Sequence, residues 1–147
     1  MEKSIISDNG IPIYYYRCKH LHYFCISLYI KAGSMYEPDE MNGATHLWEH
    51  LMFRKLNRIY NGDFYKHIDK LGLYFSACTY KEFVMIKIKG VTKHFQEAAR
   101  IISLVFEPNN LTLSEIALEK KNILPSIKRV VEVLREMKTN RKTFDLT

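Results

Sequence analysis

The sequence predicts an α+β fold, in which an antiparallel or mixed β-sheet carries its helices on one face. The first observation is the alternation of apolar and polar side chains along several short segments, which is typical of strands. The second is the order of the segments, with paired strands first and helices that can be laid over them afterwards. The third is size: 147 residues with 47% hydrophobic content can bury the core of a single domain.

Each element follows from a local pattern. β-branched and aromatic residues after the turn at Asn9-Gly10 predict a strand, and alternation predicts three more. The predicted strands are residues 11–17, 23–31, 73–79 and 83–89. The predicted helices are residues 43–55, 63–71, 92–105 and 112–138.

Capping and breaking residues set several boundaries. Asn42 is predicted to be the N-cap of the helix at 43–55, and Gly72 to end the helix at 63–71 in a left-handed conformation. Thr92 is predicted to cap the next helix, and Thr112 and Glu115 form a capping box that opens the last one. The helix at 92–105 is expected to turn one stripe of side chains inward: Phe95, Ala98, Ala99 and Ile102.

Composition excludes several classes of protein. The N-terminal residues do not resemble a signal peptide, and no apolar run reaches the length of a membrane span. The three cysteines, Cys18, Cys25 and Cys78, are odd in number and scattered among apolar residues, so we expect reduced core thiols in a cytoplasmic protein. The net charge is +6, but its basic pairs are interleaved with glutamates on late helices. We therefore expect no nucleic-acid binding.

One pentapeptide, residues 46–50, contains the candidate metal-binding and catalytic residues. In a helix, His46 and His50 stand four residues apart on one face, and Glu49 lies beside them. Two imidazoles at this spacing can hold one zinc ion, and a neighbouring carboxylate can accept a proton from water. The order His-x-x-Glu-His is the inverzincin signature. Two surface histidines on an ordinary helix are the alternative on the pentapeptide alone.

Several spaced motifs together resemble the pitrilysin (M16) family of zinc metallopeptidases. They are Ser7–Ile11, which is similar to the opening turn of the family, then Lys31–Glu37, Asn42–Phe53 and Leu71–Glu82. In the last of these, Ser76 stands in place of the usual Asn. The likeness covers residues 5–130 and implies part of the family's metallohydrolase domain, with the whole chain as one incomplete domain and residues 139–147 as a flexible tail.

The resemblance also implies a third zinc ligand, a glutamate in a later helix. The matching segment, residues 119–127, places Ser126 at that position, with Pro125 beside it to bend the helix. A neutral hydroxyl is a poor zinc ligand. Glu119 matches an earlier glutamate that supports the site; it lies roughly 10 Å from position 126 along a helix, so it becomes the ligand only if the kink shifts the helix. Zn²⁺ is therefore expected to be bound weakly or to be absent.

The chain is also shorter than the family members it resembles. Family members resemble two tandem halves that close around a peptide, and the chain corresponds to the first part of one half. An incomplete sheet leaves an unpaired edge, so we expect a partner subunit or a homo-oligomer. The resemblance implies that a peptide substrate adds as a strand along Phe75, Ser76, Ala77, Cys78 and Thr79, and that Glu49 acts as general base and then acid.

Several other residues have two possible roles, one functional and one structural. Trp48 and Phe53 either line a side-chain pocket or pack in the core, and Glu82 either supports the site or is a solvated charge at a strand end. The remaining histidines, His20, His22, His67 and His94, have no partner at ligand spacing and are expected to be surface or core residues.

Two functions remain open from the sequence. The first is a zinc metallopeptidase or peptidase subunit that cleaves small peptides, such as a leader or a modified precursor, and works with a partner chain. The second is a non-catalytic homologue that binds peptide or stabilises a catalytic partner. Because Ser126 occupies the third-ligand position, the isolated chain is expected to be weakly active or inactive.

Overall fold

The computed structural model describes residues 2–108 and 110–125. Its strands are β1 (Glu2–Ile6), β2 (Pro12–Tyr16), β3 (Tyr23–Ile30), β4 (Tyr74–Thr79) and β5 (Val84–Val91). Its helices are α1 (Ala44–Ile59), α2 (Phe64–Lys70), α3 (Phe95–Phe106) and a fourth helix over residues 113–125. Three short 3-10 turns are η1 (Ser34–Tyr36), η2 (Asp39–Met41) and η3 (Thr92–His94). Ser126 and the predicted tail lie outside the described residues.

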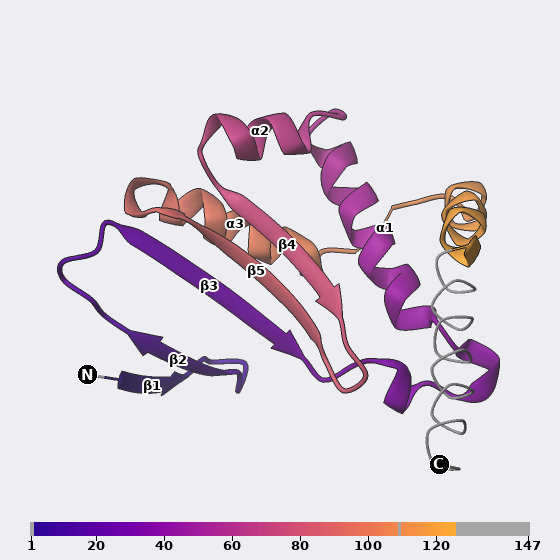
Figure 1. Ribbon diagram of the computed structural model, residues 1–147, viewed down its shortest axis with the longest axis horizontal. Coiled ribbons are helices and arrows are strands. Elements are labelled where there is room, and N and C mark those ends of the chain that lie inside the picture. The colour runs from indigo at the N-terminus through magenta and orange to yellow at the C-terminus, as the bar shows by residue number, and fades with distance from the viewer. Residues whose placement is uncertain (1, 109, 126–147) are drawn as a thin grey trace, which may run out of the picture.

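The main sheet has three antiparallel strands in the order β3-β5-β4 (Figure 1). The register places Ile88 of β5 between Ile26 of β3 and Phe75 of β4, so apolar side chains form rows across one face. Because β5 is the central strand, its side chains on that face are fully buried: Val84, Ile86 and Ile88. The predicted strands at 73–79 and 83–89 are thus confirmed.

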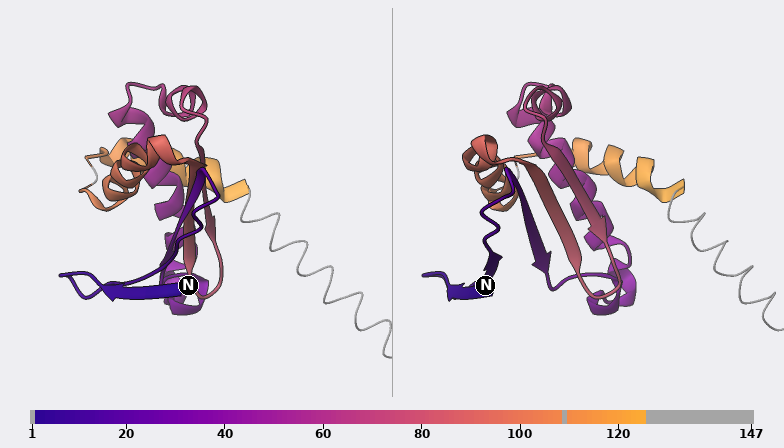
Figure 2. Two further views of the ribbon diagram at one scale, coloured as in Figure 1. Left: turned by 90° about the vertical axis from the view of Figure 1, so that its left-hand side faces the viewer. Right: turned by 60° about the vertical axis from the view of Figure 1, so that its left-hand side comes forward.

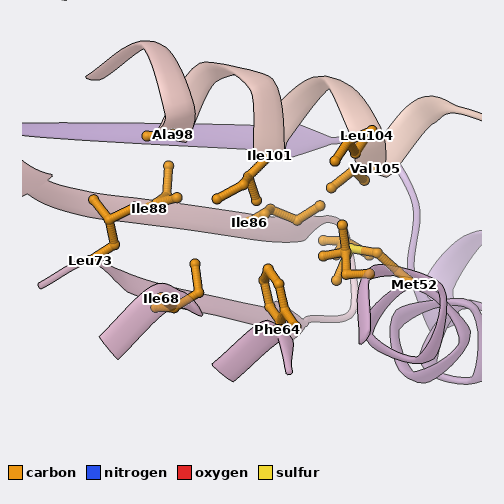
Figure 3. Close-up of a cluster of buried hydrophobic side chains, with 12 residues drawn as sticks. Met52, Phe64, Ile68, Leu73, Ile86, Ile88, Ala98, Ile101, Leu104 and Val105 are labelled. Atoms are coloured by element: carbon orange, nitrogen blue, oxygen red, sulfur yellow. The ribbon is translucent and has the colours of Figure 1, made fainter. Parts of the chain in front are cut away.

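The helices cover one face of this sheet, so the α+β prediction is confirmed (Figures 1 and 2). α3 packs against β5, whereas α1 and α2 pack against β4. The core lies between these layers (Figure 3) and consists mainly of Met52, Leu56, Phe64, Ile68, Leu73, Val84, Ile86, Ile88, Ala98, Ile101, Leu104 and Val105. On the opposite face of β3, the side chains of Tyr23, Cys25 and Tyr29 are exposed.

A separate hairpin precedes the sheet. β1 pairs with β2 in antiparallel register, and the two strands form a sheet of their own. β2 agrees with the predicted strand at 11–17, but β1 was not predicted. Large apolar side chains on the hairpin remain exposed, among them Ile6 at 76% and Tyr14 at 71%. An isolated two-stranded hairpin is marginally stable in water, so this surface favours contact with another element.

Four local predictions are wrong in whole or in part. The N-cap of α1 is Gly43 in a left-handed conformation (φ 92°), not Asn42. α3 begins at Phe95 and turns Ala98, Ile101, Leu104 and Val105 inward, because the sheet lies on that side. Of the predicted stripe, Ala98 is buried and Ile102 packs partly buried against the core, whereas Phe95 and Ala99 are exposed. Thr92 does not cap this helix; its hydroxyl donates to the carbonyl oxygen of His22.

The cysteine prediction also fails for two residues. Cys25 and Cys78 are exposed on the open face of the sheet and are not core thiols, because the register turns them away from the helices.

Two other local predictions are confirmed. Gly72 follows α2 with φ 60°, the left-handed conformation expected of a helix-ending glycine. Thr112 and Glu115 form the capping box: the Thr112 amide donates to Glu115 Oε2 at 2.7 Å, and the Glu115 amide donates to Thr112 Oγ1 at 3.3 Å. None of the described helices combines the length and apolar character needed to cross a membrane.

Candidate metal and peptide site

The start of α1 is held by a carboxylate from outside the helix. Oε2 of Glu37 accepts a hydrogen bond from the Gly43 amide at 2.7 Å, and Oε1 accepts one from the Thr45 amide at 2.6 Å. Burial would raise the pKa of Glu37, but the hydrogen bonds from Thr45 and Gly43 outweigh it and lower the pKa below its usual value. The negative charge also complements the positive end of the helix. Glu37 therefore fixes where α1 begins, one turn before the site.

α1 presents the three predicted residues together. His46, Glu49 and His50 are half-buried on neighbouring turns of the helix, within a helix one turn longer than predicted. The rings of His46 and His50 lie with centroids 4.8 Å apart and planes inclined at 72°. The i, i+4 spacing in the sequence therefore brings both imidazoles to one small region.

Glu119 comes to this region from the fourth helix. Its Oε1 lies 3.2 Å from Nδ1 of His50, and its Oε2 accepts a hydrogen bond from Nε of Arg54 at 3.1 Å. When Nδ1 of His50 donates to the carboxylate, Nε2 is left as the free metal-binding nitrogen. Both oxygens of Glu119 have partners, an arrangement that suits a residue orienting His50 better than one that binds a metal directly.

Glu49 is connected to the sheet. The hydroxyl of Thr79 at the end of β4 donates a hydrogen bond to Oε2 of Glu49. Sequence reasoning missed this contact, because the two residues lie thirty positions apart and nothing in either segment specifies the pairing. The contact places the carboxylate at the junction of α1 and the strand edge.

The donor set fits a zinc ion in kind but is incomplete in number. His46 and His50 offer two imidazole nitrogens, whereas a catalytic zinc usually takes three protein ligands. Within residues 2–108 and 110–125, no group of three or more His, Cys, Asp or Glu side chains is arranged to hold a metal ion. The predicted third position, Ser126, lies outside the described residues.

β4 occupies an edge of the three-stranded sheet, next to α1. Among the described residues, its outer side has no partner strand, so the backbone of residues 75–79 is placed where a peptide could pair with it. Phe75 turns toward the core, where its ring contacts those of Phe53 and Phe64. The core interpretation of Phe53 is thus favoured.

Other sequence candidates fall into different surroundings. Trp48 is 36% exposed and borders a hollow of about 330 Å³ together with Ile30, Ala32, Ala44 and Thr45. Glu82 is exposed in the turn between β4 and β5. His67 pairs with Glu97, with 2.9 Å between Nε2 and Oε1, so it belongs to a contact between α2 and α3.

Comparison with known proteins gives a consistent result. The model of the insulinase family, peptidase family M16, matches residues 20–145. The chain is 29% identical over 112 residues to the human mitochondrial-processing peptidase subunit beta, which covers 76% of this chain and 23% of that protein. It is 26% identical over 119 residues to the mouse mitochondrial cytochrome b-c1 complex subunit 1, which covers 81% of this chain and 25% of that protein. The chain thus spans about a quarter of the length of these relatives.

A solved structure has the same fold. The crystal structure of a protease from Helicobacter pylori superimposes with a TM-score of 0.77 at 20% identity, over 86% of this chain and 30% of that chain.

Proposed function

Because the chain belongs to the insulinase family, peptidase family M16, we propose that it acts as a subunit of a zinc-dependent peptidase. Its substrates would be small peptides, such as a leader or a modified precursor, and it would work together with a partner chain. The scattered, odd number of cysteines supports a cytoplasmic location.

The observation that carries this proposal is the bond between Thr79 and Glu49. It joins the two parts that peptide hydrolysis needs: a carboxylate beside two histidines, and a free strand edge on which a peptide backbone can lie.

Each residue then has a role. A zinc ion bound through His46 and His50 would supply Lewis-acid chemistry at the peptide carbonyl. Glu49 would take a proton from water and return it to the leaving amine, and Thr79 would hold its carboxylate in place. Glu119 would orient His50, and residues 75–79 would bind the peptide backbone with little regard to side-chain sequence.

Two features support the need for a partner chain, either another subunit or a second copy. The outer side of β4 is unpaired among the described residues, and the hairpin of β1 and β2 exposes Ile5 and Ile6. The two relatives above are both named as subunits. A partner could cover the hairpin and supply a third zinc ligand.

Metal content of the purified chain tests the proposal. We expect substoichiometric zinc in the parent chain, a further loss in His46→Ala, and near-stoichiometric zinc in Ser126→Glu, which restores a carboxylate at the expected third position. His20→Ala is the matched control, because His20 is an exposed histidine outside the site. Zinc content that is equal in the parent, His46→Ala and Ser126→Glu chains would contradict the proposed site.

Turnover is the second measurement. The purified chain is expected to cleave an unstructured peptide poorly, since two imidazoles alone hold zinc weakly. The Ser126→Glu chain, or the parent with its partner, should cleave faster and should lose this activity in Glu49→Gln. Cleavage that survives Glu49→Gln would exclude Glu49 as the general base.

A non-catalytic role is the second candidate. The incomplete metal-ligand set of the described residues favours it. In that case the chain would bind peptide along β4 or stabilise a catalytic partner, and zinc would remain absent even with the partner present.

A further inference from the structure

A large groove lies at the far end of β4 from the metal-site residues. It has a volume of about 1020 Å³ and is bordered by the end of the hairpin, the start of β3 and the first residue of β4. Its walls include Arg17, Lys19 and Lys89, together with Tyr16, Tyr23 and Tyr74. Neither the metal chemistry nor the contacts of α1 use these residues.

The charged side chains that line the groove are all positive. Three cations line it, and no aspartate or glutamate does. In the part of the chain that the structure describes, Arg17, Lys19 and Lys89 form no salt bridge with a carboxylate. The ammonium group of Lys89 instead lies 4.5 Å from the centre of the Tyr74 ring. A concave surface with this charge attracts anions and repels cations.

The tyrosines give the groove its second property. Tyr16, Tyr23 and Tyr74 are 70%, 69% and 52% exposed. Such side chains offer both apolar contact area and a hydroxyl group for hydrogen bonding, which is why tyrosine is common where proteins bind peptides. The groove therefore suits a ligand with carboxylates and a backbone to contact, rather than a small inorganic anion.

β4 leads from this groove to the site. Tyr74, its first residue, lines the groove, and Thr79, its last, bonds to Glu49. The six residues of the strand span roughly 17 Å. A peptide that lies extended along the edge of β4 with its reactive bond at Glu49 thus reaches the groove about five residues away.

We propose that this groove binds an acidic segment of the peptide held along β4, about five or more residues from the bond at Glu49. This inference rests on the proposed function, since it assumes that a peptide pairs with β4. It adds a preference for substrates, because the strand edge alone reads only the backbone. The continuity with a strand edge also favours a peptide over a nucleic acid, whose backbone cannot extend the sheet.

Binding of labelled peptides, followed by fluorescence anisotropy on Glu49→Gln protein, tests the inference without cleavage. Two peptides share a neutral extended segment of about six residues, long enough to cover β4; one continues into four glutamates and the other into four glutamines. Each is made with the tail at either end. An oligothymidylate of similar length is the nucleic-acid probe.

The expected result is a clear preference for glutamate. Exposed ion pairs are each worth about two- to fivefold in affinity, so three cations should favour the glutamate tail by roughly tenfold or more at low salt. The preference should vanish at about 1 M salt, where charges are screened. It should also vanish in the triple variant Arg17→Gln, Lys19→Gln, Lys89→Gln, and fall about two- to fivefold in Lys89→Gln alone. A matched triple variant at exposed lysines elsewhere, Lys66→Gln, Lys70→Gln, Lys81→Gln, should keep it.

Three outcomes would overturn the inference. Equal binding of the two peptides would exclude an acidic preference and leave the proposed function standing. Failure of both peptides to bind would overturn the inference and also peptide binding along β4. Tighter binding of the oligothymidylate, lost in the groove triple variant, would make the groove a nucleic-acid site instead.

Discussion

Nδ1 of His50 on α1 lies 3.2 Å from Oε1 of Glu119 on the fourth helix. These residues are 69 positions apart, and the contact decides which ring nitrogen of His50 can face a metal. Glu119 is shielded from solvent, with its side chain 14% exposed, and Arg54 holds its second oxygen. The histidine is thus oriented by a carboxylate that is itself fixed.

Replacing Glu119 should therefore weaken metal binding. In the Ser126→Glu background, Glu119→Gln is expected to lower zinc affinity by about 10- to 100-fold, as removal of such orienting partners usually does. Competition with a chromogenic chelator measures the affinity. The matched control is Glu115→Gln, one turn earlier on the same helix and paired with Arg58. Equal affinities for Glu119→Gln and the background protein would mean that Glu119 does not orient His50.

Removing the Glu37 carboxylate should destabilise α1. Glu37→Ala leaves the Gly43 and Thr45 amides without their acceptor and removes a charge that favours the helix N-terminus. We expect a loss of about 1–2 kcal/mol in the free energy of unfolding, measured by urea denaturation. Glu40→Ala, an exposed carboxylate in the same segment, is the control and should change stability little. Similar losses in the two variants would argue against capping by Glu37.

The contact between α2 and α3 should respond to acid. Hydrogen bonds from Arg100 are the main cause that lowers the pKa of Glu97 from 4.5 to about 2; burial opposes this shift, and His67 and Tyr60 add to it. Because the folded-state pKa is depressed, the contribution of Glu97 to stability is present above pH 4.5 and is lost as the pH falls through 2.

Glu97→Gln provides the measurement. It should lower the free energy of unfolding by roughly 2 kcal/mol at pH 6, and the difference from the parent protein should shrink as the pH approaches 2. Asp69→Asn, at an exposed carboxylate on α2, is the control. A difference that stays constant from pH 6 to pH 2 would show that the ionised carboxylate is not what stabilises this contact.

A buried lysine, Lys55, caps the C-terminal end of α3. Nζ of Lys55 donates to the carbonyl oxygens of Val105 at 2.9 Å and Glu107 at 2.7 Å, and the residue is 7% exposed. Lys55→Met retains a long unbranched side chain but leaves these carbonyl groups without their hydrogen-bond donor. We therefore expect a loss of about 1–3 kcal/mol in the free energy of unfolding. Lys66→Met, on the surface of α2, should cost far less. An unchanged unfolding midpoint for Lys55→Met would exclude this role.

Features set by neighbouring residues were predicted from the sequence. The alternation of apolar and polar residues identified the strand at 83–89, because successive strand residues point to opposite sides; the structure buries Val84, Ile86 and Ile88 on one of these sides. The capping box at Thr112 and Glu115 and the left-handed Gly72 needed only local geometry. The spacing of His46 and His50 on a helix placed both rings together for the same reason.

Predictions failed where the local sequence was compatible with more than one helix face or capping residue. The helix α3 is rich in apolar residues on more than one side, so the pattern admitted a stripe through Phe95 and Ala99. Packing against β5 kept Ala98 inward, as predicted, and buried Ile101 and Leu104 in place of Phe95 and Ala99. The start of α1 was assigned to Asn42 because its side chain can cap locally, whereas Glu37 caps from six positions before Gly43.

The sequence by itself determined the family motifs, the order of the helices and of strands β2 to β5, and the side chains that carry chemistry, because these depend on spacing along the chain. Only the tertiary structure decided what meets those side chains: Thr79 against Glu49, Glu119 against His50, and a cationic groove at the far end of the same edge strand. Contacts between distant segments depend on how sheet and helices pack together, and packing is a property of the whole fold rather than of any stretch within it.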